Sequence, residues 1–177
     1  SWNNHGSIEC VDGQWYVFYH RCSRGRELYR RLCIEPISIL PDGSIPEVKM
    51  TSRGPGKPFG DGETIYGYQA CEVHGKAFIG IDGEGSEYLC NIADGDEAVF
   101  RYVKSEKGFS KAVLRTLGEA EVELSLDGEV LGSVKIQEDG KHEMHFSNRQ
   151  KGGKEQEMVL KFTAAEDFKV ISVTLYE

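Results

Sequence analysis

Short runs of β-branched and aromatic residues, each ended by a turn signal, follow one another along most of the chain. Residues 122–126 and 130–136 alternate between apolar and polar side chains, with Asp127-Gly128 between them. Alternation is typical of strands with one buried face, and an Asp-Gly pair favours a tight hairpin turn because both central residues need positive φ. Helical periodicity is almost absent. The sequence therefore predicts an all-β protein.

The first 50 residues contain the most strongly strand-like stretch. Asp12-Gly13 predicts a turn, and the run Trp15-Tyr16-Val17-Phe18-Tyr19-His20-Arg21 follows it. A small sheet of this size is marginally stable alone in water. Since aromatic side chains fall on both faces of such a strand, we expect both faces to be covered. One face should pack on the rest of the chain, and the other on residues outside this sequence or on a second copy, so self-association is possible.

A Gly- and Pro-rich segment at 51–63 predicts a linker between two units, residues 1–50 and residues 64–177. The second unit reads as many short strands, which is typical of a β-sandwich. The expected strands include those over residues 65–71, 111–117, 121–126, 157–162 and 168–176.

Composition narrows the choice of partners. The net charge of -8 and the sequence pI of about 5.2 argue against nucleic acid and anionic membranes, which attract basic surfaces. A neutral polymer such as a polysaccharide suits this chain better. Its five cysteines are scattered, and Cys10, Cys33, Cys71 and Cys90 lie among apolar neighbours. We expect buried free thiols and a cytoplasmic location.

The N-terminal stretch resembles the end of the catalytic domain in glycoside hydrolase family 43. The residues concerned are Asn4-His5-Gly6-Ser7 and the aromatic run at 15–21. The resemblance implies closing strands of a five-bladed β-propeller. The family's catalytic carboxylates come from earlier blades, so no catalytic residue is assigned here. The chain is expected to be the C-terminal portion of a longer enzyme, with those missing N-terminal blades as its partner.

The second unit resembles carbohydrate-binding module family 6, a β-sandwich of the jelly-roll type. The similar stretches are residues 88–96 and 122–131 and the final strand. Several positions depart from the family pattern, among them Tyr68, Lys169 and Ser172. Tyr68 stands where a glutamate helps to bind structural calcium, and Lys169 stands where an asparagine contacts sugar. These departures favour a structural role over sugar binding.

Several residues are candidates for a functional site. The resemblance implies that His5 helps to hold a metal ion, often calcium, on the propeller axis. Asn3, Asn4 and Ser7 could line the same place, or could be ordinary polar residues of a turn and a strand start. Tyr68 and Tyr88 could stack against sugar rings, although core packing is the stronger explanation for most such aromatic residues. By contrast, the acids of the first unit are interpreted as solvated strand or turn residues, namely Glu9, Asp12, Glu27 and Glu35.

The sequence thus predicts the C-terminal portion of a glycosidase that acts on arabinofuranosyl or xylosyl linkages of hemicellulose. The sandwich would brace the catalytic propeller. Alternatively, it would be a non-catalytic module that binds an oligosaccharide or polysaccharide and targets the enzyme to plant material.

Overall fold

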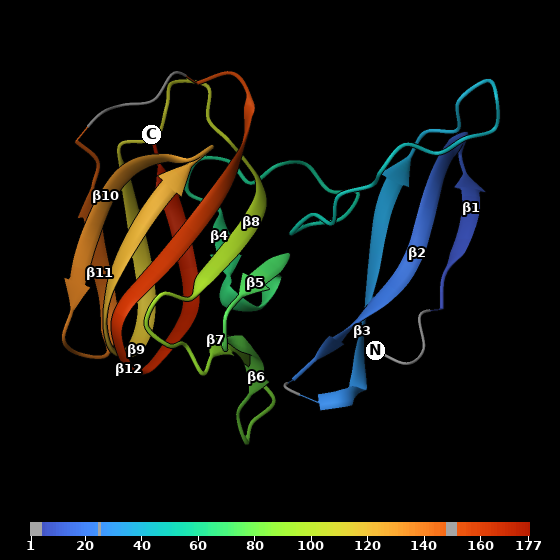
Figure 1. The fold of residues 1–177 in the computed structure, drawn as a ribbon. Coiled ribbons are helices and arrows are strands. Elements are labelled where there is room, and N and C mark those ends of the chain that lie inside the picture. The colour runs from blue at the N-terminus through green and yellow to red at the C-terminus, as the bar shows by residue number, and fades with distance from the viewer. Residues whose placement is uncertain (1–4, 25, 148–151) are drawn as a thin grey trace.

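A computed structural model describes residues 5–24, 26–147 and 152–177. It has two parts, a three-stranded sheet and a larger β-sandwich that stands beside it (Figure 1). An all-β, sandwich-like fold is therefore confirmed. No helix among the described residues is long and apolar enough to cross a membrane.

The small sheet is an antiparallel meander in the order β1-β2-β3. It consists of β1 (Ser7–Val11), β2 (Gln14–Ser23) and β3 (Arg26–Ile37). The β1-β2 hairpin turns at Asp12 and Gly13, which have φ of 50° and 84°. The Asp-Gly signal thus predicted this turn correctly.

The sandwich contains the remaining strands and one short 3-10 helix, η1. Its elements are β4 (Thr64–Tyr66), η1 (Gly67–Gln69), β5 (Glu72–His74), β6 (Phe78–Ile81), β7 (Glu87–Cys90), β8 (Glu97–Lys104), β9 (Lys111–Leu126), β10 (Glu129–Ile136), β11 (Gly140–His145) and β12 (Glu155–Tyr176).

Two long strands connect the layers of the sandwich. The first half of β9 pairs with β11 and the second half with β10, while β12 runs antiparallel to β9 along both halves. The bend lies at Gly118 and Asp167, whose φ values are 82° and 47°. We predicted separate strands on each side of this bend, and that prediction is wrong. Bulges turn the two strands without interrupting them, so no loop marks the corner in the sequence.

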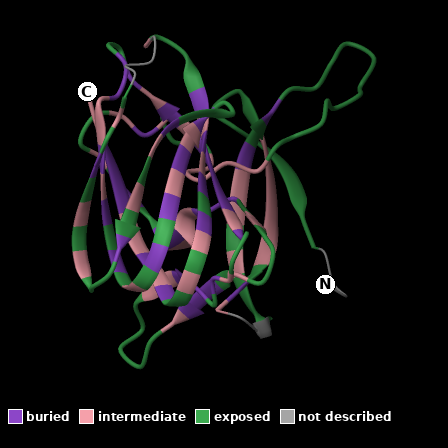
Figure 2. Ribbon diagram, turned by 60° about the vertical axis from the view of Figure 1, so that its left-hand side comes forward, coloured by how far each residue is buried: buried purple, intermediate pink, exposed green. Residues whose placement is uncertain are grey.

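The hydrophobic core lies inside the sandwich. Its largest fully buried side chains include Phe59, Phe100, Phe109, Phe162 and Phe168. Figure 2 shows buried residues alternating with exposed ones along the sandwich strands. Within the described residues, the three-stranded sheet adds no side chain to this core cluster. Its stability must therefore come from its contact with the sandwich.

The segment predicted as a linker is bound to the sandwich. Phe59 is 2% exposed, pairs with Val103 in a parallel bridge and exchanges backbone hydrogen bonds with Tyr102 and Lys104. Near its other end, Ser52 exchanges hydrogen bonds with the backbone of Arg101. The segment between these two attachments, residues 53–58, is called the strap below.

The strand predicted over residues 65–71 is wrong beyond Tyr66. The chain turns into η1 there, and the Gln69 side chain accepts a hydrogen bond from the Tyr66 backbone N–H at 2.9 Å. Gly67 is buried against the neighbouring strands, with the Val170 carbonyl close to where a side chain would begin. This close packing is a tertiary constraint that local strand propensity does not report.

The prediction of buried thiols is wrong for one of its four cysteines. Cys71 and Cys90 are buried and Cys33 is half-buried, but Cys10 is exposed on β1. The sandwich does not extend over that edge of the small sheet. Cys22, for which burial was not expected, is exposed as well.

Gly67 provides a test of the packing around η1. A Cβ at this position would lie 2.1 Å from the Val170 carbonyl oxygen, so Gly67→Ala should lower the free energy of unfolding by about 2–3 kcal/mol. Gly83→Ala is the matched control, because its Cβ would meet nothing within 4 Å. Equal unfolding temperatures for the two variants would contradict this account.

Candidate functional site at the junction of sheet and sandwich

Arg21 on β2 makes the central contact between the sheet and the sandwich. Its guanidinium donates hydrogen bonds to the backbone carbonyls of Ala70 at 2.6 Å and Tyr68 at 3.0 Å, with a longer one to Cys71 at 3.4 Å. These carbonyls lie at the C-terminal end of η1, where a helix leaves acceptors unpaired and favours a cation. One side chain of the sheet thus satisfies three acceptors of the sandwich.

A second polar contact lies beside the first. Glu87 on β7 forms ion pairs with Arg24, at 3.3 Å, and with Arg31, and it also accepts a hydrogen bond from Ser23 at 3.3 Å. Burial, followed by the nearby charge of Arg21, lowers the pKa of Arg31. One carboxylate therefore counters a cluster of cations brought by the sheet.

Tyr68, predicted as a sugar platform, belongs to this junction. Arg31 lies over its ring at 4.7 Å from the centroid, and the Tyr66 ring stacks on it at 5.3 Å with an interplanar angle of 5°. The ring is half-buried. Its ring thus contacts both Arg31 and Tyr66 at the junction, and its role as a sugar platform stays a prediction.

Tyr88, the other predicted platform, lies away from the junction, in a pocket of about 350 Å³ that also includes Asn91 and Phe168. The ammonium group of Lys169 lies over the Tyr88 ring at 5.3 Å. A cation therefore occupies part of the space above this ring. The structure does not bring Tyr68 and Tyr88 together in one pocket.

Glu35 on β3 is a residue whose importance the sequence analysis missed. It was interpreted as solvated, but it is 2% exposed and accepts hydrogen bonds from the Thr51 N–H at 2.7 Å and hydroxyl at 2.8 Å. The interpretation is wrong because the start of the predicted linker folds over β3. Burial, then the charges of Cys33 and Glu35, raise the pKa of the neighbouring Tyr19 hydroxyl. Alternation along Cys33, Glu35 and Ile37 could have revealed the inward position.

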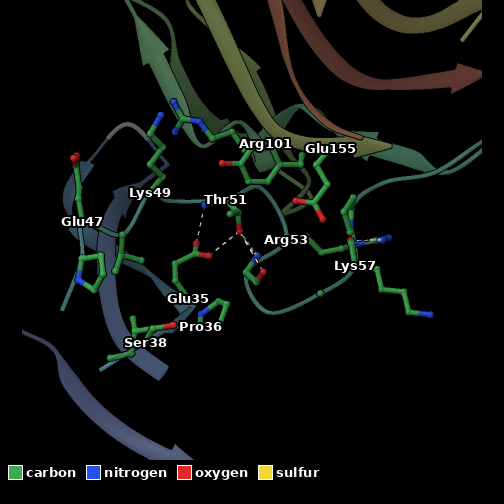
Figure 3. A pocket seen from close by; sticks show the side chains of 17 residues that line it. Glu35, Pro36, Ser38, Glu47, Lys49, Thr51, Arg53, Lys57, Arg101 and Glu155 are labelled. Atoms are coloured by element: carbon green, nitrogen blue, oxygen red, sulfur yellow. Dashed lines mark hydrogen bonds between the residues drawn. The ribbon is translucent and has the colours of Figure 1, made fainter. Parts of the chain in front are cut away.

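A pocket of about 580 Å³ lies above this contact, between the end of β3, the strap and β8 (Figure 3). Its lining includes Glu35, Ser38, Tyr102 and Glu155. Arg101 closes one side, with its side chain only 7% exposed.

Arg101 is itself held by two acids, Glu72 at 2.7 Å and Glu157, and it donates to the Met50 carbonyl at 3.3 Å. These contacts raise the pKa of Arg101, the hydrogen bond with Glu72 contributing most, and the same hydrogen bond lowers the pKa of Glu72.

His5, the predicted metal ligand, is exposed just before β1. Its ring lies 6.1 Å from that of His20. Asn3 and Asn4 lie outside the described residues. Among the residues that the structure does describe, no group of three or more histidines, cysteines and acids could hold a metal ion. The metal role of His5 thus stays a prediction.

Comparison with known proteins gives a consistent result. No family model matches the chain. A xylosidase/arabinosidase from Thermoclostridium stercorarium is 32% identical over an alignment of 190 residues. The alignment covers 85% of this chain and 40% of that protein. The chain belongs to glycoside hydrolase family 43, as the resemblance predicted. The chain spans well under half of this relative's length.

Solved structures agree on the fold. A family 43 arabinoxylan arabinofuranohydrolase from Bacillus subtilis matches 99% of this chain and 41% of its own, with a TM-score of 0.62 and 17% identity. A family 6 carbohydrate-binding module from Clostridium stercorarium matches 69% of this chain and 98% of its own, with a TM-score of 0.58 and 14% identity. The sandwich therefore shares the fold of family 6 modules.

The contact made by Arg21 can be tested by substitution. Arg21→Met should lower the free energy of unfolding by about 1–3 kcal/mol, because it leaves buried carbonyl groups without a charged donor. Hydrogen exchange should accelerate in β2 and β3 more than in β9. Arg115→Met is the matched control, since Arg115 is exposed on β9. Unchanged exchange in β2 and β3 would show that Arg21 does not hold the sheet.

Proposed function

We propose that this chain is part of a family 43 glycosidase in which the sandwich braces the closing strands of the catalytic propeller. The complete enzyme would cleave arabinofuranosyl or xylosyl linkages of hemicellulose. The substrate class rests on the relative that is called a xylosidase/arabinosidase and on the fold shared with an arabinoxylan arabinofuranohydrolase.

The observation that carries the bracing role is the chemistry of the junction. The sheet brings Arg21, Arg24 and Arg31, while the sandwich supplies Glu87 and the carbonyls at the end of η1. Polar groups in such a contact need their partners, since a buried group left unpaired costs free energy. A junction of this kind favours one fixed arrangement of sheet and sandwich over a flexible tether.

The far face of the sheet supports its assignment to a propeller. Phe18 and Ile34 lie opposite each other on this face, and so do His20 and Leu32. Leu32 is 65% exposed, and the sandwich covers the other face. Covering such side chains stabilises a sheet by about 25 cal/mol per Å² of apolar surface. We propose that the preceding blades cover this face in the complete enzyme, with self-association as the alternative when they are absent.

A second candidate function is sugar binding by the sandwich. The pocket at Tyr88 favours it, because it contains a half-buried aromatic ring and the Asn91 side chain. A structurally similar family 6 module was solved in complex with cellobiose. Under this proposal the sandwich would direct the enzyme to plant polysaccharide. Lys169 over the ring weakens the case, so bracing remains the first proposal.

A calcium ion on the propeller axis is a further proposal, resting on the family resemblance. The described residues do not form such a site, because His5 offers one imidazole and calcium prefers several oxygen ligands. Other ligands would have to come from residues outside the described part of the chain. We therefore derive no step of the reaction through this ion.

The bracing role predicts a specific defect in the complete enzyme. Glu87→Gln should lower the temperature of half-inactivation by about 2–8 °C, because Arg24 and Arg31 lose their counter-charge close to Arg21. The rate of arabinofuranoside or xyloside cleavage at low temperature should change little, since Glu87 is not proposed to touch substrate.

Glu84→Gln is the matched control, because Glu84 lies exposed in the neighbouring β6-β7 turn. The bracing role predicts a normal inactivation temperature for Tyr88→Ala, whereas the sugar-binding role predicts that this variant loses retention on insoluble xylan. Loss of retention without any effect of Glu87→Gln on stability would favour the second candidate function.

A further inference from the structure

The strap, which forms one wall of the pocket above Glu35, is anchored before any ligand arrives. The strap is attached to β8 at both ends, through Ser52 with Arg101 and through Phe59 with Tyr102. Arg53 holds it from within, by donating to the Lys57 carbonyl at 3.1 Å and pairing with Glu63 at 2.8 Å. A ligand that contacts the strap thus avoids the free-energy cost of ordering this wall.

The floor of the pocket comes from the other side of the junction. Glu35 belongs to the small sheet, and its carboxylate is committed to Thr51 at the start of the strap. The pocket is therefore shared between sheet and sandwich. Its volume of about 580 Å³ falls within the range of small-molecule sites, and the boundary between two units is a common place for them.

The remaining polar groups of the lining are free to bind. Within the described part of the chain, the side chains of Glu155 and Ser38 have no hydrogen-bond or ion-pair partner. In Figure 3, the Glu155 carboxylate points toward the strap and the hollow beside it. Exposed Lys49 and Lys57 lie on the rim, and neither forms an ion pair with another described residue.

The half-buried ring of Tyr102 completes the chemistry of the pocket. An aromatic ring supplies an apolar surface for the C–H groups of a sugar. A free carboxylate accepts hydrogen bonds from hydroxyl groups, and ammonium groups donate to them. Charged side chains of both signs around one ring suit a ligand with many hydroxyl groups and no net charge.

We propose that this junction pocket binds a neutral oligosaccharide, at a site distinct from the pocket at Tyr88. The choice of a pentose oligosaccharide as the ligand rests on the proposed function. Acids and bases both line the pocket, so a sugar carboxylate would meet repulsion from Glu155 and Glu35 as well as attraction to Lys49 and Lys57. Since the sheet and the sandwich both line the site, the contact between them would also form part of a substrate-binding site.

Calorimetric titration of the chain with xylotetraose tests the proposal, with tetragalacturonate as the acidic comparison. We expect saturable binding of xylotetraose alone. Tyr102→Leu should weaken it about tenfold, and the isosteric Glu155→Gln should weaken it several-fold. Phe78→Leu is the matched control, because Phe78 is 40% exposed on β6 and does not line this pocket. Thermal unfolding of each variant reports whether it folds.

Absence of xylotetraose binding would overturn the proposal, as would binding that Tyr88→Ala abolishes and Glu155→Gln leaves intact. Neither result touches the brace, which the stability of Glu87→Gln tests separately. Conversely, xylotetraose binding that depends on Glu155, with no effect of Glu87→Gln on stability, would support the pocket and remove the bracing role.

Discussion

The arrangement of the whole chain depends on a guanidinium group placed at the open end of a short helix. The sheet has no core of its own, and the end of η1 has carbonyl groups that its own turns do not satisfy. Arg21 joins the two parts, because its guanidinium on the sheet donates hydrogen bonds to those carbonyls of the sandwich. Separating the two parts would expose the apolar sheet and leave the guanidinium and the carbonyls to be solvated again.

The strap depends on that contact and extends it. Once the sheet lies against the sandwich, β3 presents Glu35 to Thr51, while Phe59 enters the sandwich core. Residues that a sequence composition assigns to a linker thus become the wall of a pocket. Glycine is needed where this segment runs close to the sheet. At Gly54, which has φ of 64°, a Cβ would lie only 2.6 Å from the Ile34 carbonyl oxygen.

The elements predicted well from sequence are those governed by neighbouring residues. The Asp12-Gly13 turn and the 122–136 hairpin follow from local turn chemistry and period-two alternation, and both occur as expected. The errors share a different cause. The bend through Gly118, the turn at Gly67 and the burial of Glu35 are each imposed by a segment distant in sequence. Local patterns report none of these contacts.

The same distinction separates the two tyrosines predicted as sugar platforms. Tyr68 and Tyr88 look alike in sequence, as aromatic residues in short strands of one domain. Arg31, more than thirty residues earlier, lies over the ring of the first. For the second, Lys169 approaches the ring from the far end of the chain but leaves a pocket beside it. Whether an aromatic ring can serve as a platform for sugar thus depends on which side chains cover it. In this fold the covering groups are cations that lie far away in the sequence.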